Sequence, residues 1–131
     1  MTPGIDILIV DDDKALLDVL RTVLEGEGHR VQIVPSAYEA LPLLNAQRYD
    51  LVLVDLKMRR MDGLELLEHE RLQERGTRMV IMTAYPTVDS AVHAMRQGAF
   101  DYLVKPFKLT DLRAVVERAA AAGPEKAAPE G

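Results

Sequence analysis

The residues Ile7-Leu8-Ile9-Val10 form a short apolar run that ends abruptly at the acidic pair Asp11-Asp12. Three later runs also end on polar residues: Leu51-Val52-Leu53-Val54 before Asp55, Met79-Val80-Ile81-Met82 before Thr83, and Tyr102-Leu103-Val104 before Lys105-Pro106. If these runs are parallel strands of one sheet, all four ends lie at the same edge, where such sheets bind ligands. The edge would then carry carboxylates, a hydroxyl and an ammonium, groups that suit a divalent cation and a phosphoryl group.

Apolar runs alternate with amphipathic segments along most of the chain. The expected strands are residues 5–10, 31–34, 51–54, 79–82 and 102–104. The expected helices follow residue 13, begin at the Ser36 and Asp62 capping boxes, and span about residues 87–97 and 110–122. Strands that are apolar throughout indicate a parallel sheet covered on both faces, and right-handed crossovers place helices there. We therefore predict an α/β fold with a doubly wound, five-stranded parallel sheet built from five βα units.

Length and composition indicate one globular domain. The chain has 131 residues, 48% hydrophobic residues and no cysteine, so a reducing cytoplasm is compatible and thiol chemistry is excluded. We expect a disordered N-terminus at residues 1–4, a domain at 5–122, and a linker or tail at 123–131. No apolar stretch approaches the ~20 residues that span a membrane, and no signal peptide is recognisable. The net charge of -5 argues against nucleic-acid binding.

The polar residues at the strand ends suggest different chemical roles. Crowded carboxylates repel one another unless a cation neutralises them, and Mg²⁺, with Mn²⁺ as a substitute, prefers such oxygen ligands. An acidic pair after a strand could instead cap the next helix, a role that we assign to Asp13. Asp55 stands alone after its strand, which favours it as the nucleophile of an acyl phosphate. Lys105 could neutralise a phosphate oxygen and Thr83 could donate a hydroxyl to it, although Thr83 could also simply end its strand.

The chain resembles the response-regulator receiver family, whose fold is CheY-like with strand order 2-1-3-4-5. The motifs that carry this resemblance are Val10-Asp11-Asp12, Leu53-Val54-Asp55, Met61-Asp62-Gly63, Met82-Thr83-Ala84 and Lys105-Pro106-Phe107. The resemblance implies that Asp55 accepts a phosphoryl group from the phosphohistidine of a sensor histidine kinase. It also implies that Asp12 binds Mg²⁺ directly and Asp11 through water, that the backbone carbonyl of Lys57 is a further ligand, and that Lys105 acts through a cis bond to Pro106.

The same resemblance implies a conformational switch. The Thr83 hydroxyl would move toward the phosphoryl group, and Tyr102 would turn inward and change the surface of the fourth helix, fifth strand and fifth helix. Tyr102 could alternatively serve only in sheet packing. Lys57 and Tyr85 each lie two residues beyond a site residue, where receivers tune the access of water, so we expect Tyr85 to shield the phosphoryl group.

Two other classes of protein compete with a receiver. An aspartyl-phosphate phosphatase or phosphotransferase of the haloacid-dehalogenase type needs an acid two residues after Asp55, where this chain has Lys57. An interaction domain that is not phosphorylated would not need all of the polar residues that end the expected strands. We expect a signalling module that catalyses only its own phosphorylation and dephosphorylation. Its partners would be a histidine kinase and an effector domain or target, with a homodimer as a family expectation.

The three histidines, at positions 29, 69 and 93, lack the spacing of metal ligands. We therefore expect them at the surface. The segment Gly98-Ala99-Phe100-Asp101-Tyr102 resembles receivers attached to enhancer-binding transcription activators.

Overall fold

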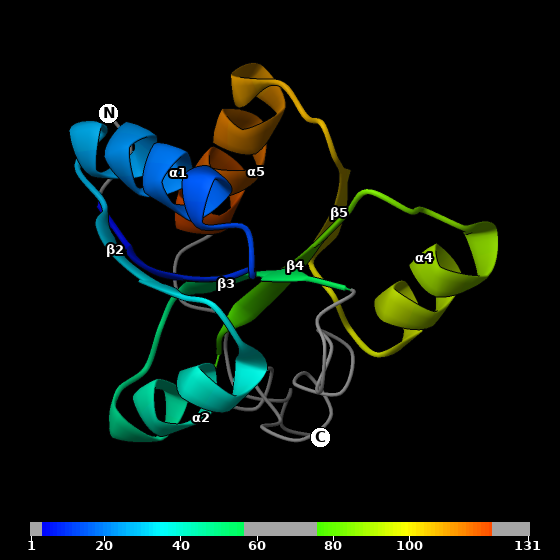
Figure 1. The fold of residues 1–131 in the computed structure, drawn as a ribbon, viewed down its shortest axis with the longest axis horizontal. Helices are drawn as coiled ribbons and strands as arrows, with labels where there is room; N and C mark the ends of the chain where they lie inside the picture. The colour runs from blue at the N-terminus through cyan, green and yellow to red at the C-terminus, as the bar shows by residue number, and fades with distance from the viewer. Residues whose placement is uncertain (1–3, 57–75, 122–131) are drawn as a thin grey trace.

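The computed structural model describes residues 4–56 and 76–121 (Figure 1). The predicted helix at Asp62, the carbonyl of Lys57 and both predicted tails, apart from Gly4 in the N-terminal one, lie outside these residues. The described elements are β1 (Asp6–Val10), α1 (Lys14–Gly26), β2 (Arg30–Val34), α2 (Ala37–Ala46), β3 (Leu51–Asp55), β4 (Arg78–Thr83), α4 (Val88–Arg96), β5 (Asp101–Val104) and α5 (Leu109–Ala121).

The five strands form a single parallel sheet in the order β2-β1-β3-β4-β5. The predicted strand order and fold class are therefore confirmed. Every residue of the central strands β3 and β4 is buried, as their apolar runs predict, and so are the polar residues Asp55, Arg78 and Thr83 at their ends. In the edge strand β2 the polar residues Arg30 and Gln32 are exposed, whereas the apolar residues are half-buried.

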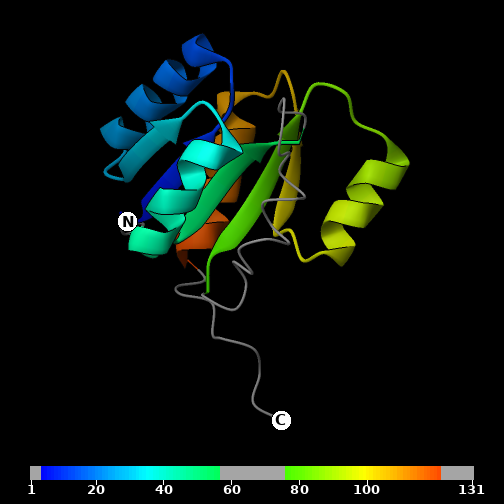
Figure 2. The same cartoon turned by 60° about the horizontal axis from the view of Figure 1, so that its bottom comes forward.

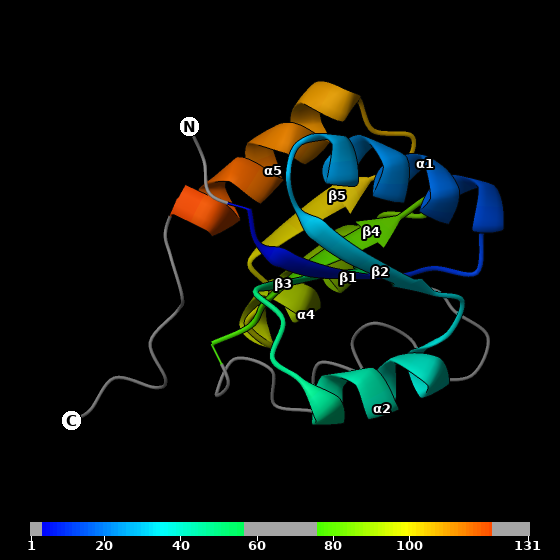
Figure 3. The ribbon, with the colours of Figure 1, turned by 90° about the vertical axis from the view of Figure 1, so that its left-hand side faces the viewer.

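Helices cover both faces of the sheet. Helices α1 and α5 lie together on one face, whereas α2 lies on the opposite face (Figure 3). Because side chains alternate along a strand, Ile7 and Ile9 pack toward α1 and α5, while Leu8 and Val10 pack toward α2. Fully burying a side chain of this size contributes about 1.5–3 kcal/mol to stability, so the two cores together hold the strand ends in place.

Helix termini follow the local sequence signals. The Asp13 carboxylate accepts a hydrogen bond from the Leu16 amide and caps α1, and Ser36 caps α2 in the same way. Helix α4 ends at Arg96 with Gln97 as its C-cap, and Gly98 follows with a φ of 98°, which is favourable only for glycine. The amides of Gly98 and Ala99 donate to carbonyls of the last helical turn, which turns the chain toward β5.

Helix α4 stands at the β5 side of the sheet and extends away from it (Figures 1 and 2). Ala94 is the buried residue of this helix, whereas Val88, Val92 and Met95 are exposed. Helix α4 is therefore attached to the domain through a narrow contact.

His29 does not lie at the surface as its sequence context led us to expect. It is only 8% exposed, and its Nδ1 atom accepts a hydrogen bond of 3.1 Å from the Ile5 amide. The expectation was wrong because His29 has a structural backbone partner at the start of the sheet, which no spacing rule reveals. Burial lowers its pKa, a shift that Glu27 opposes and Arg30 reinforces.

Within residues 4–56 and 76–121, none of the helices combines the length and the apolar character needed to cross a membrane.

Candidate functional site

The strand register brings the polar strand ends together. Val10 of β1 lies opposite Val54 of β3, so Asp11 and Asp55 follow at the same level. Thr83 of β4 lies opposite Val104 of β5, so Lys105 follows directly beyond it. Because all strands are parallel, these side chains meet at the carboxyl edge of the sheet.

Three acidic residues form the centre of the site. Carboxylate oxygens of Asp11, Asp12 and Asp55 all lie within 4.8 Å of one another. Asp11 is fully buried, Asp55 is 8% exposed and Asp12 is exposed. Hard cations prefer this kind of oxygen donor set, and the exposed member leaves a side of the site open to solvent. The residues therefore fit a divalent cation.

Lys105 lies between two of these carboxylates. Its Nζ atom is 2.5 Å from Asp11 Oδ2 and 3.1 Å from Asp55 Oδ2. The peptide bond that follows it, Lys105-Pro106, is cis, the isomer expected from the resemblance. The backbone amide of Lys105 donates to the Thr83 carbonyl, so β4 holds the base of this side chain.

Burial and the charges of the site together shift the pKa values of Asp11 and Lys105. Burial raises the pKa of Asp11, although hydrogen bonds from Lys105 and from the Asp13 amide oppose the shift. Burial would lower the pKa of Lys105, but its hydrogen bond to Asp11 and the charges of Asp11 and Asp55 outweigh it and raise the pKa. Lys105 is therefore a firmly protonated cation beside Asp55, and Asp11 is a carboxylate that a further positive charge would stabilise.

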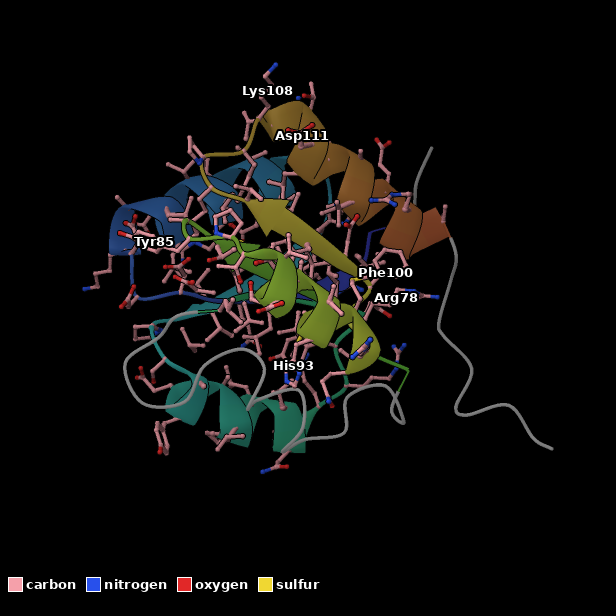
Figure 4. All side chains as sticks on the ribbon, turned by 90° about the vertical axis from the view of Figure 1, so that its right-hand side faces the viewer. Arg78, Tyr85, His93, Phe100, Lys108 and Asp111 are labelled. Atoms are coloured by element: carbon pink, nitrogen blue, oxygen red, sulfur yellow. The ribbon has the colours of Figure 1, made fainter. Side chains whose placement is uncertain are left out.

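Thr83 is fully buried at the end of β4. Its Oγ1 atom accepts a hydrogen bond of 3.0 Å from the backbone amide of Tyr85, two residues further on. The Tyr85 side chain is 68% exposed and lies at the carboxyl edge of the sheet (Figure 4). The structure thus places Thr83 at the predicted edge and Tyr85 near it.

Tyr102 is half-buried and packs against the core on the α2 side of the sheet. Its hydroxyl lies 2.9 Å from the Ser90 hydroxyl on α4. Residue patterns did not single out Ser90. Its only local signal is its position three residues after the N-cap Thr87, which indicates helix capping and says nothing of β5.

A pocket of about 370 Å³ adjoins Lys105. It is lined by Asp13, Leu16, Ala84, Lys105, Pro106 and Phe107. The pocket is open to solvent beside the only ammonium that contacts the acidic cluster within the described residues. Sequence reasoning noted Phe107 only as part of a motif and did not identify Leu16 as a residue beside the site.

Comparison with known proteins identifies the family. Residues 7–117 match the response regulator receiver domain, which is most of the chain. The chain belongs to the response regulator receiver family. It is thus a receiver domain of the kind found in two-component systems, as its motifs predicted.

Its relatives include transcriptional regulators. The receiver is 41% identical over 118 residues to the transcriptional regulatory protein ZraR of Escherichia coli, covering 90% of the chain and 27% of that relative. It is 46% identical over 107 residues to the alginate biosynthesis transcriptional regulatory protein AlgB of Pseudomonas aeruginosa, covering 82% and 24%. The chain therefore spans about a quarter of the length of these relatives.

Solved structures support the fold. A CheY-like response regulator receiver domain from Methanospirillum hungatei superposes with a TM-score of 0.85 at 34% identity, covering 91% of this chain and 95% of that one. The receiver also resembles NtrX from Brucella abortus, solved in complex with ADP, with a TM-score of 0.82 at 35% identity over 91% of this chain and 27% of that one. Both likenesses agree with the strand order described above.

Proposed function

We propose that this receiver takes a phosphoryl group from the phosphohistidine of a sensor histidine kinase onto Asp55. The observation that carries the proposal is the position of the Lys105 ammonium 3.1 Å from the Asp55 carboxylate, at an edge that also gathers Asp11 and Asp12. A carboxylate next to a fixed cation can be approached by an anionic phosphoryl group with less repulsion than an isolated one.

The transfer requires little of the protein beyond positioning and charge. An oxygen of Asp55 bonds to phosphorus while the phosphorus–nitrogen bond of the phosphohistidine breaks, and the imidazole nitrogen keeps the electron pair. The Asp55 side chain is 12% exposed, which leaves a path for the donor. Lys105 would offset charge on the phosphoryl oxygens, and Thr83 would donate its hydroxyl to one of them.

Asp11, Asp12 and Asp55 would hold Mg²⁺, or Mn²⁺ in its place, with the backbone carbonyl of Lys57 as a further ligand. The ion would supply positive charge that offsets the carboxylates and the incoming phosphoryl group. The fit rests on the oxygen donor set and on the raised pKa of Asp11, which indicates a buried carboxylate in need of more positive charge.

The output would follow from Thr83 and Tyr102, the pair expected to change the surface of α4, β5 and α5. An effector domain or downstream target would recognise that surface, and a second copy of the receiver is another candidate. Tyr85 would shield the phosphoryl group from water. The named roles of the relatives in transcription, and the quarter of their length that the receiver spans, support a transcriptional effector.

A phosphorylation assay tests the proposal. The chain is incubated with Mg²⁺ and acetyl phosphate, and its mass is measured. We expect a gain of one phosphoryl group in the wild type, and none in Asp55→Ala or after removal of Mg²⁺ with a chelator. Asp18→Ala, which alters an exposed aspartate on α1, should behave like the wild type.

The alternatives give different results. A phosphatase would hydrolyse its aspartyl phosphate too fast for an adduct to accumulate while it releases inorganic phosphate, although Lys57 leaves it without the general acid for this. A wild type with neither an adduct nor phosphate release would contradict the proposal and favour an interaction domain that works without phosphorylation.

A further inference from the structure

The segment from residue 84 to 89, which joins β4 to α4 and includes the first two residues of α4, is exposed at every residue. Both of its ends are held by hydroxyl groups of residues assigned to the switch. At its start the Tyr85 amide donates to Thr83 Oγ1, and just past its end the Ser90 hydroxyl meets the Tyr102 hydroxyl. The two switch residues are therefore connected to the same exposed segment.

The first turn of α4 has little apolar packing to hold it in place. Val88 is 80% exposed, Ser90 and Ala91 are half-buried, and the buried Ala94 lies one turn further on. A hydrogen bond between partly desolvated hydroxyls is worth a substantial share of the attachment of so lightly packed a turn. The Ser90–Tyr102 hydrogen bond thus links this turn to β5.

Hydrogen-bonding capacity identifies the donor in this pair. Ser90 Oγ accepts a bond of 3.2 Å from the Thr87 amide and lies 3.1 Å from the Thr87 carbonyl, to which it can only donate. A hydroxyl has one proton and two acceptor positions. Tyr102 must therefore donate to the remaining acceptor position of Ser90, and every bonding position of the Ser90 hydroxyl is then used.

We propose that Ser90 is a positioning residue that couples Tyr102 to the N-terminal turn of α4. While Tyr102 donates to Ser90, the first turn of α4 is held against β5. When Tyr102 turns toward Thr83, Ser90 loses this partner and the turn loosens, together with the exposed apolar residues Val88 and Val92. This inference rests on the proposed phosphorylation of Asp55 for its trigger, but the bond itself belongs to the unphosphorylated receiver.

Hydrogen–deuterium exchange of the backbone amides at residues 88–92 tests the coupling in the unphosphorylated full chain. Tyr102→Phe removes the donor and leaves the capping box of Thr87 and Ser90 intact. We expect about fivefold faster exchange, the effect of losing one neutral hydrogen bond. Tyr38→Phe, which removes the hydroxyl of an exposed tyrosine on α2, is the matched control and should exchange like the wild type.

Variants of Ser90 separate coupling from simple helix capping. Ser90→Ala should exchange faster than Tyr102→Phe because it also loses the capping bond, whereas Ser90→Thr keeps the hydroxyl and should restore slow exchange. Adding Tyr102→Phe to Ser90→Ala should not speed exchange further, because Ser90→Ala has already removed the Ser90–Tyr102 hydrogen bond. If the two substitutions acted independently, their effects on the exchange rate would multiply. Unchanged exchange in Tyr102→Phe, or independent effects in the double variant, overturns the proposal.

Phosphorylation provides the last readout. Acetyl phosphate with Mg²⁺ should speed exchange at 88–92 in the wild type and have little further effect in Tyr102→Phe. If the Asp55 adduct forms and the wild-type exchange stays the same, the coupling is overturned while the proposed function stands. If no adduct forms, the proposed phosphorylation of Asp55, and with it the trigger of the coupling, is wrong. The hydrogen bond itself is judged separately, by the exchange of Tyr102→Phe measured without acetyl phosphate.

Discussion

The amino ends and the carboxyl ends of the same five strands carry similar charged residues but pair them differently. At the amino ends each of three aspartates has an arginine partner: Asp6 with Arg30, Asp50 with Arg48, and Asp101 with Arg118. At the carboxyl ends Asp11, Asp12 and Asp55 lie close together, and Lys105 contacts Asp11 and Asp55. At the amino edge of the sheet the protein itself neutralises the aspartates, whereas at the carboxyl edge negative charge remains for a ligand to neutralise.

The pKa directions express the same contrast. Burial alone would raise the pKa of Asp50, but the Asp6 amide and the Arg48 guanidinium outweigh it and lower the pKa. Burial raises the pKa of Asp11 in spite of Lys105. Carboxylates with a shifted pKa of this kind are concentrated at functional sites, because catalysis and ligand binding need charges that the protein itself does not neutralise.

Aromatic packing completes the balanced edge. The guanidinium carbons of Arg78 and Arg118 lie 5.4 and 5.8 Å from the centre of the Phe100 ring. Arg78 and Phe100 lie together at the end of the sheet opposite Tyr85 (Figure 4). The amino edge therefore uses its cations for structure, and changes there should affect stability rather than phosphorylation.

The largest expected effect is the loss of Lys105. Lys105→Ala removes the ammonium that contacts Asp55, and the rate of phosphorylation by acetyl phosphate should fall about a hundredfold, as it does when one fixed electrostatic donor is lost from a site. Arg48→Ala removes a cation from the opposite edge and should leave the rate unchanged. Similar phosphorylation rates in Lys105→Ala and the wild type would contradict the view that only the carboxyl edge serves phosphorylation.

The second effect concerns metal binding and stability. Mg²⁺ at about a hundredfold above its dissociation constant should raise the free energy of unfolding by about 2.7 kcal/mol, because it binds the folded receiver alone. Urea unfolding with and without Mg²⁺ measures this gain. Asp11→Asn should reduce the gain, whereas Asp50→Asn should keep it although it weakens the fold. An equal gain in both variants would mean that Mg²⁺ binds elsewhere.

The smallest effect is a pH dependence at the amino edge. Because burial lowers the pKa of His29, its contribution to stability is complete above the ordinary histidine pKa and declines as the pH falls through that value toward the lower folded pKa. The wild type should therefore lose more stability between pH 7.5 and pH 5 than His29→Asn, whose side-chain oxygen can accept from the Ile5 amide at either pH.

Local signals predicted many features of the structure. The apolar runs marked the strands to within one residue at their ends, and the capping residues Asp13 and Ser36 marked the starts of two helices. These features depend on neighbours a few residues away, so they can be read from a short window. His29 was misplaced and Ser90 was overlooked because their partners, Ile5 and Tyr102, lie 24 and 12 residues away.

The amino-acid sequence by itself determined which residue ends each strand, and parallel strands then required those residues to share an edge. Only the tertiary structure decided which of them touch. Lys105 meets Asp11 across 94 residues of sequence because the strand order puts β1 beside β3 and β4 beside β5. Contacts of this range depend on the packing of the two cores against the sheet, and that packing also decided that Tyr102 meets Ser90.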